Sequence, residues 1–134
     1  MKQKELEKND QGLTIMNAKN LKIICERDDL YSFPELNEKL YLHYKGNYDW
    51  IIAKGFECIQ NLEPYHNLCA IWLNNNGILK IEGLLSLTNL TSVFLNHNLI
   101  TKIEGLDNCE NIITLNLSHN KIHKIEGLQN LTKL

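Results

Sequence analysis

One segment of this chain recurs with a fixed spacing of 22 residues, and this repeat limits the possible folds more than any other feature. Three consecutive copies occupy residues 68–89, 90–111 and 112–133, and they align without insertion or deletion. Each copy has aliphatic residues at the same positions, one shared asparagine and a shared Ile-Glu-Gly-Leu sequence. A repeat of this length is typical of solenoids, in which each unit buries its apolar face only against its neighbours.

Each copy begins with a short alternating segment. In the first copy, Ile71 and Leu73 point to one side and Trp72 to the other, as in a strand with one buried face. Such a strand is stable only beside others, so the pattern predicts a parallel sheet on the concave side of the solenoid. After the glycine of each copy, apolar residues recur at every third position, which predicts 3-10 or helical turns on the convex side. The predicted fold class is therefore an α/β solenoid.

An asparagine follows each predicted strand, at the point where the chain turns inward. Its amide group can bond the buried backbone groups of its own turn and of the next coil. We therefore predict a structural asparagine ladder. Its members are Asn76, Asn98 and Asn120.

The sequence before the regular repeats predicts three regions. Residues 1–16 are charged and expected to be flexible, and residues 17–39 form a helical cap. In this cap, Leu21, Ile24 and Cys25 have helical spacing, and Phe33-Pro34 followed by Leu36 predicts a break and a short turn that also covers the first coil. Residues 40–134 form the repeat array.

The strand of the first, imperfect coil has two candidates, residues 40–42 and residues 49–52. We favour Leu40 to Leu42, because Asp49 would place a carboxylate in the core. Residues 47–55 are then an insertion that is looped out. At the other end the array is incomplete at Leu134, so we expect fraying of the last coil and self-association through its uncovered edge.

Composition and charge exclude several functions. With 14 basic and 16 acidic residues the chain has a formal charge of -2, so no basic field suits nucleic acid. The sequence contains neither the pattern of a signal peptide nor that of a membrane span. It therefore predicts a cytoplasmic protein. The four cysteines lack the spacing of a zinc or disulfide framework and are expected to be reduced.

Two stretches resemble a known family. Residues 30–46, with Tyr-Leu-His-Tyr-Lys-Gly at positions 41–46, and residues 56–78, with Trp72, are similar to the amino-terminal cap and first repeats of the leucine-rich repeat axonemal dynein assembly factor. Residues 47–55 interrupt the family pattern. The resemblance implies a leucine-rich repeat protein of the cytoplasm and the cilium or flagellum. It would help to assemble dynein arms by holding dynein arm subunits or assembly chaperones.

The outward strand positions and the residues beside them form the predicted partner-binding surface. Exposed aromatic rings in one column favour protein docking, and the alternative is that they only pack on one another to shield the sheet. The predicted surface consists of Tyr41, Trp72, Asn74, Phe94, Asn96, His97, Asn116, Ser118 and His119.

No catalytic constellation or cofactor motif is present, so the sequence predicts a scaffold without enzymatic activity. His97 and His119 occupy equivalent positions in adjacent copies, but no cysteine or carboxylate shares their column, so we expect no metal. The alternative functions are a regulatory subunit of a protein phosphatase and an adaptor similar to a dynein light chain.

Overall fold

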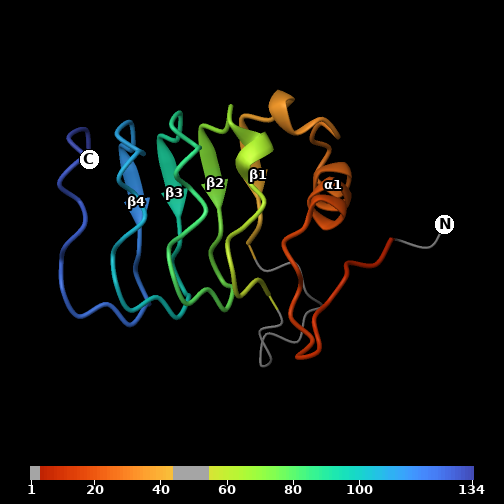
Figure 1. The fold of residues 1–134 in the computed structure, drawn as a ribbon, viewed down its shortest axis with the longest axis horizontal. Coiled ribbons are helices and arrows are strands. Elements are labelled where there is room, and N and C mark those ends of the chain that lie inside the picture. Colours follow the sequence, from red (N-terminus) through yellow and green to blue (C-terminus); the bar gives the residue numbers. More distant parts are fainter. Residues whose placement is uncertain (1–3, 44–54) are drawn as a thin grey trace.

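Four short parallel strands lie side by side in the computed structural model, which describes residues 4–43 and 55–134 (Figure 1). They are β1 (Lys39–Tyr41), β2 (Ala70–Trp72), β3 (Ser92–Phe94) and β4 (Thr114–Asn116), and they follow one another in the sheet as in the sequence. Equivalent repeat residues are paired, as Ile71 with Val93 and Val93 with Leu115. Each coil thus adds one strand, and the predicted solenoid is confirmed.

β1 takes the first place in the sheet, beside β2. Leu40 and Leu42 are fully buried, as the alternation of residues 40–42 predicted. Residues 47–54, which include the competing strand segment, lie outside the described residues. Gly55, expected as the last residue of a looped-out insertion, is instead buried. It lies so close to Asn76 that an added Cβ would be 2.2 Å from the Oδ1 of that side chain.

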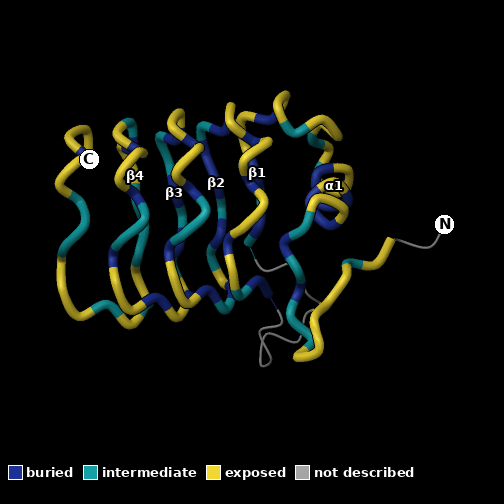
Figure 2. The backbone as a smooth tube through the Cα atoms, viewed as in Figure 1, coloured by how far each residue is buried: buried dark blue, intermediate teal, exposed yellow. Residues whose placement is uncertain are grey.

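The core is a continuous file of aliphatic side chains enclosed by the coils. The backbone at the buried residues is dark blue in Figure 2. The repeat positions of the coils starting at residues 68 and 90 are almost all inaccessible to solvent. In the last coil, Leu115, Leu117 and Ile122 are only partly buried, and Ile125 is 80% exposed. Each coil therefore depends on the following one to bury its apolar side chains, as expected for a solenoid.

The repeated glycine allows successive coils to approach closely. Gly105 has a φ of 73°, in the left-handed region, and an added Cβ would lie 2.4 Å from the carbonyl oxygen of Ile81 in the preceding coil. Gly83 and Gly127 have the same conformation and the same close contact. Both the backbone conformation and the spacing between coils therefore require glycine here.

Helix α1 (Ala18–Arg27) lies beside β1 at the amino-terminal end of the sheet (Figure 1). It begins at Asn17, whose side chain accepts a hydrogen bond from the backbone N–H of Asn20. Leu21, Ile24 and Cys25 are buried in the core, as their helical spacing predicted. Within the described part of the chain, no helix has the length and apolarity needed to cross a membrane.

Residues 4–16 are packed against this helix, although we expected residues 1–16 to be flexible. The chain turns back on itself in an antiparallel bridge between Lys8 and Thr14. The buried amide of Asn20 donates hydrogen bonds to the carbonyl groups of Glu7 and Ile15, at 2.9 and 2.7 Å. Charge composition alone did not indicate this segment, because its conformation depends on specific hydrogen bonds, including those of Asn20 in the following helix.

Two short 3-10 turns, η1 (Pro34–Leu36) and η2 (Glu63–Tyr65), lie on adjacent coils. The sequence correctly placed a break and a short turn at η1. The turn packs beside η2, but the side chains of Phe33 and Leu36, which we expected to cover the first coil, are 66% and 52% exposed. The buried Tyr65 of η2 takes part in the core instead, and its hydroxyl lies 3.9 Å from the Sγ of Cys25.

Candidate functional site

The aromatic column consists of Tyr41, Trp72 and Phe94, which occupy paired positions on β1, β2 and β3. The ring centroids of Tyr41 and Trp72 are 4.8 Å apart, and those of Trp72 and Phe94 are 5.1 Å apart with nearly parallel planes. All three residues are half-buried. The sheet register thus produces a stack of rings whose outer surfaces are available to a partner.

The fourth position of this column is polar. Asn116 pairs with Phe94 on the neighbouring strand, and it is half-buried. Its Oδ1 accepts hydrogen bonds from the backbone N–H and from the hydroxyl of Ser118, at 3.1 and 2.8 Å. Asn116 is therefore held by its own strand and does not extend the stack.

The next column along the chain contains asparagines, and one of their atoms has no partner. Asn74 and Asn96 are both half-buried at equivalent positions after β2 and β3. Among the described residues, the Oδ1 of Asn74 is a buried oxygen without a hydrogen-bond partner. An unpaired buried acceptor is destabilising and uncommon in folded proteins, so Asn74 is distinctive beside the aromatic column.

His97 and His119 have exposed rings that stack face to face, with centroids 4.2 Å apart and planes 8° apart. Both residues have a positive φ, of 56° and 55°, and so does Asn75 at the equivalent position of the preceding coil. The sequence placed the two rings near each other but did not indicate the left-handed backbone. The two stacked rings therefore form an exposed polar part of this surface.

The asparagine ladder lies beneath this surface and fixes its strands. The Oδ1 of Asn98 accepts hydrogen bonds from the backbone N–H groups of Asn76 and Ile78, at 3.2 and 3.1 Å. Its Nδ2 donates to the carbonyl groups of Leu73 and Leu95, at 3.0 and 2.9 Å. One buried amide therefore joins two successive coils, so that the aromatic column rests on a rigid frame.

No reactive centre accompanies this surface in the part of the chain that the structure describes. No group of three or more His, Cys, Asp or Glu residues is arranged to hold a metal ion there. Burial and, secondarily, the charge of Asp107 raise the pKa of the Cys109 thiol to about 11. Burial, with the charges of Glu57 and Glu82, also raises the pKa of Cys58. Neither thiol is activated as a nucleophile, because only the thiolate is reactive.

The stacked strands, the asparagine ladder and the repeated glycines define the class: the chain is a leucine-rich repeat protein. A family model described as leucine rich repeats (2 copies) matches residues 66–108. The crystal structure of internalin C2 from Listeria monocytogenes is similar, with a TM-score of 0.53 and 29% sequence identity. That similarity covers 57% of this chain and 34% of the internalin chain.

The chain is homologous over about half of its length to dynein axonemal assembly factor 1. It is 49% identical over 67 residues to the homolog from Drosophila erecta, covering 50% of this chain and 4% of that protein. The human protein is 41% identical over 58 residues, which are 43% of this chain and 7% of its own length. The resemblance that the sequence suggested is confirmed, whereas the chain matches only a small part of these relatives.

Proposed function

We propose that this chain is a non-catalytic scaffold that binds a protein partner through the aromatic column, in the assembly of axonemal dynein. The homology to proteins named dynein axonemal assembly factor 1 is the observation on which the biological role rests. On this proposal the chain acts in the cytoplasm of ciliated or flagellated cells. Its partners are dynein arm subunits or the chaperones that assemble them.

The surface chemistry supports protein binding. Half-exposed aromatic rings provide large apolar contact areas with few rotatable bonds, and such residues dominate the binding energy of many interfaces. The stack is flanked by polar groups that can form hydrogen bonds at its rim. The proposed rim consists of Asn74, Asn96, His97, Asn116, Ser118 and His119.

Phe94→Ser is the variant that tests this proposal. Phe94 ends the stack, so its removal exposes less of the remaining rings than removal of Trp72 from the middle would. Leu85→Ser is the matched control, because Leu85 is a large apolar residue that is 52% exposed and lies outside the strands. Both variants should remain folded, with Leu85→Ser close to the unmodified chain in melting temperature and Phe94→Ser lowered by a few degrees, because it loses one stacking contact.

The experiment is affinity purification of the tagged chain and both variants from ciliated cells, followed by mass spectrometry. We expect axonemal dynein arm subunits or cytosolic chaperones to be recovered with the unmodified chain and with Leu85→Ser. Recovery should fall roughly tenfold or more with Phe94→Ser, as for loss of an aromatic residue that contributes strongly to an interface. A phosphatase catalytic subunit in place of these proteins, or equal recovery with Phe94→Ser, would contradict the proposal.

A further inference from the structure

The cap loop, residues 29–38 between α1 and β1, exposes three large apolar side chains within six residues. Tyr31 is 62% exposed, Phe33 66% and Leu36 52%. Single exposed apolar residues are normal on a protein surface, but a group of three with two aromatic rings is characteristic of an interaction site. The cap loop lies outside the aromatic column, and the proposed function makes no use of it.

The backbone of the cap loop is held in a fixed conformation. The side chain of Asn37 is buried beneath it, with only 1% exposure. Its Oδ1 accepts a hydrogen bond from the N–H of Tyr31 at 3.0 Å, and its Nδ2 donates to the carbonyl group of Tyr31 at 2.8 Å. The carbonyl of Phe33 lies 3.5 Å from the same Nδ2. The exposed rings are therefore carried by a backbone that one buried amide organises.

The loop is also anchored at its beginning and in its middle. At the end of α1, the N–H of Leu30 donates to the carbonyl of Cys25 at 2.8 Å, closing the helix, and Asp29 takes the left-handed conformation with a φ of 56°. In the middle of the loop, the Nδ2 of Asn67 from the next coil donates to the carbonyl of Glu35 at 2.8 Å. A partner would therefore lose little binding energy to ordering of the loop.

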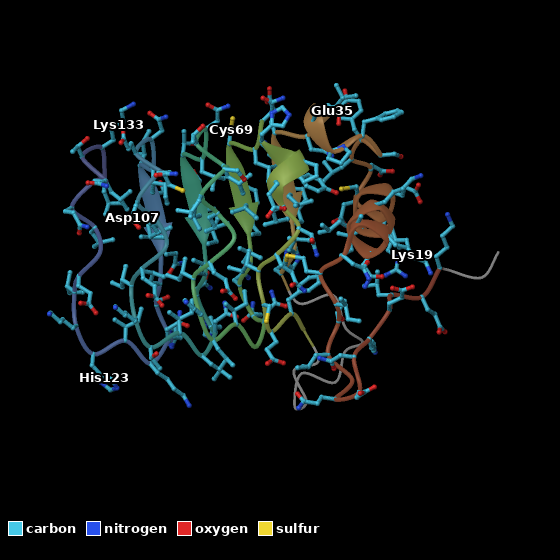
Figure 3. All side chains as sticks on the ribbon, viewed as in Figure 1. Lys19, Glu35, Cys69, Asp107, His123 and Lys133 are labelled. Carbon is cyan, nitrogen blue, oxygen red and sulfur yellow. The ribbon has the colours of Figure 1, made fainter. Side chains whose placement is uncertain are left out.

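The charge around these rings is negative. Asp29, Glu35 and Glu38 are exposed on the loop, and the exposed Glu63 lies on η2, which packs beside η1. Figure 3 labels Glu35 on this loop at the edge of the stack. The sequence contains no basic residue from position 28 to position 38, and the first one after it is Lys39. Apolar side chains within an acidic rim are complementary to a segment that is apolar and basic.

We propose that the cap loop binds a basic amphipathic peptide segment of a second protein partner. Apolar side chains of that segment contact Tyr31, Phe33 and Leu36, while its lysine or arginine side chains face the carboxylates. The acidic rim disfavours an anionic lipid surface, which would be repelled. It also disfavours a second copy of this chain, because a two-fold contact would bring the same negative charges together.

A peptide-display experiment tests this proposal on the whole 134-residue chain. A random peptide library is selected on the immobilised chain and counter-selected on the double variant Tyr31→Ser/Phe33→Ser. We expect the enriched peptides to combine lysine or arginine with leucine, phenylalanine or tryptophan. Their affinity should fall roughly tenfold or more in the double variant and in Glu35→Lys, weaken with added salt, and be unchanged in Leu85→Ser and Phe94→Ser.

Several outcomes would overturn the proposal. Enriched peptides that are acidic or uncharged would contradict the role of the rim, and equal binding to the double variant would contradict the role of the rings. Binding that is lost in Phe94→Ser would assign the peptides to the aromatic column instead. Dimers that dissociate in the double variant, or binding to phosphatidylserine vesicles, would assign the loop to a second copy or to a lipid surface. The exposed Glu35→Lys variant keeps the test valid even if the double variant fails to fold.

Discussion

Asn98 and Asn120 are the same residue in successive copies of the repeat, yet they differ in what surrounds them. Asn98 is 5% exposed and makes five hydrogen bonds, two accepted by its Oδ1 and three donated by its Nδ2. Asn120 is half-buried and makes four hydrogen bonds among the described residues: its Oδ1 accepts only from the N–H of Ile100, and its Nδ2 makes three donations like those of Asn98. Water can replace lost partners at Asn120 but not at Asn98.

We therefore predict that Asn98→Ala lowers the free energy of unfolding by roughly 3 kcal/mol or more, because it leaves several buried backbone groups unpaired. Asn120→Ala should cost only about 1 kcal/mol, since solvent reaches the groups that it exposes. Urea denaturation of both variants measures these costs. Equal losses at the two positions would mean that burial does not determine how much each ladder asparagine contributes to the free energy of unfolding.

Two glycines allow a similar comparison at the residue scale. Gly105→Ala would force a Cβ to within 2.4 Å of the carbonyl oxygen of Ile81 at a φ of 73°, so we predict a loss of roughly 2 kcal/mol or more. At Gly77, which does not have a positive φ, the contact nearest to an added Cβ is the carbonyl oxygen of Phe56 at 3.8 Å. Gly77→Ala should therefore be neutral or stabilise by about 0.5 kcal/mol. Thermal unfolding of the two variants measures these changes in stability. A Gly105→Ala variant as stable as the unmodified chain would show that the coils can move apart.

At the scale of the strand, the aromatic column has two consequences that can be separated. The rings stack on one another, as the alternative interpretation of the sequence required, and they remain half-exposed, as docking requires. Packing between the rings and binding of a partner are therefore compatible. Stability measurements report the first, and partner recovery reports the second.

The contribution of stacking can be measured with a double-mutant cycle on Trp72 and Phe94. We predict a coupling of about 0.5–1.5 kcal/mol between Trp72→Leu and Phe94→Leu, which is typical of an aromatic pair at this distance. Guanidinium denaturation of the two single variants and the double variant gives this coupling. A value near zero would mean that the rings are adjacent only because the sheet register places them there.

Elements that belong to the repeat could be predicted from the sequence, because the same residue pattern occurs in several copies. The alternation around Ile71 and the helical spacing around Leu21 gave the strands and the cap helix. The cap loop was misassigned, because apolar residues such as Phe33 were assumed to cover the first coil. The exposure of Phe33 and the conformation of His97 depend on tertiary hydrogen bonds and on backbone angles that no local pattern specifies.

For the whole molecule, stability should vary along the stack, because each coil contacts only its neighbours. The backbone N–H of the first residue after a strand donates a hydrogen bond to a backbone carbonyl group of the following coil. Leu73 donates to the carbonyl of Phe94, and Leu95 to that of Asn116, both at 2.8 Å. The equivalent residue of the last coil is Leu117, and β4 is the last strand of the sheet among the described residues. Figure 2 shows this coil mostly in teal and yellow, whereas the earlier coils also carry dark blue, buried segments.

We predict that hydrogen exchange in the 134-residue chain slows from the last coil toward the middle of the stack. The amides of Leu73 and Leu95 should exchange only through extensive unfolding, because they are hydrogen-bonded within a buried core. The amide of Leu117 should exchange faster by roughly a hundredfold or more, since local opening of the edge exposes it and a difference of about 3 kcal/mol corresponds to that factor. Amide-resolved exchange by NMR measures all three in one sample. Uniform protection from Leu73 to Leu117 would show that the stack unfolds as a single cooperative unit and that the partly exposed side chains of the last coil cost it no local stability.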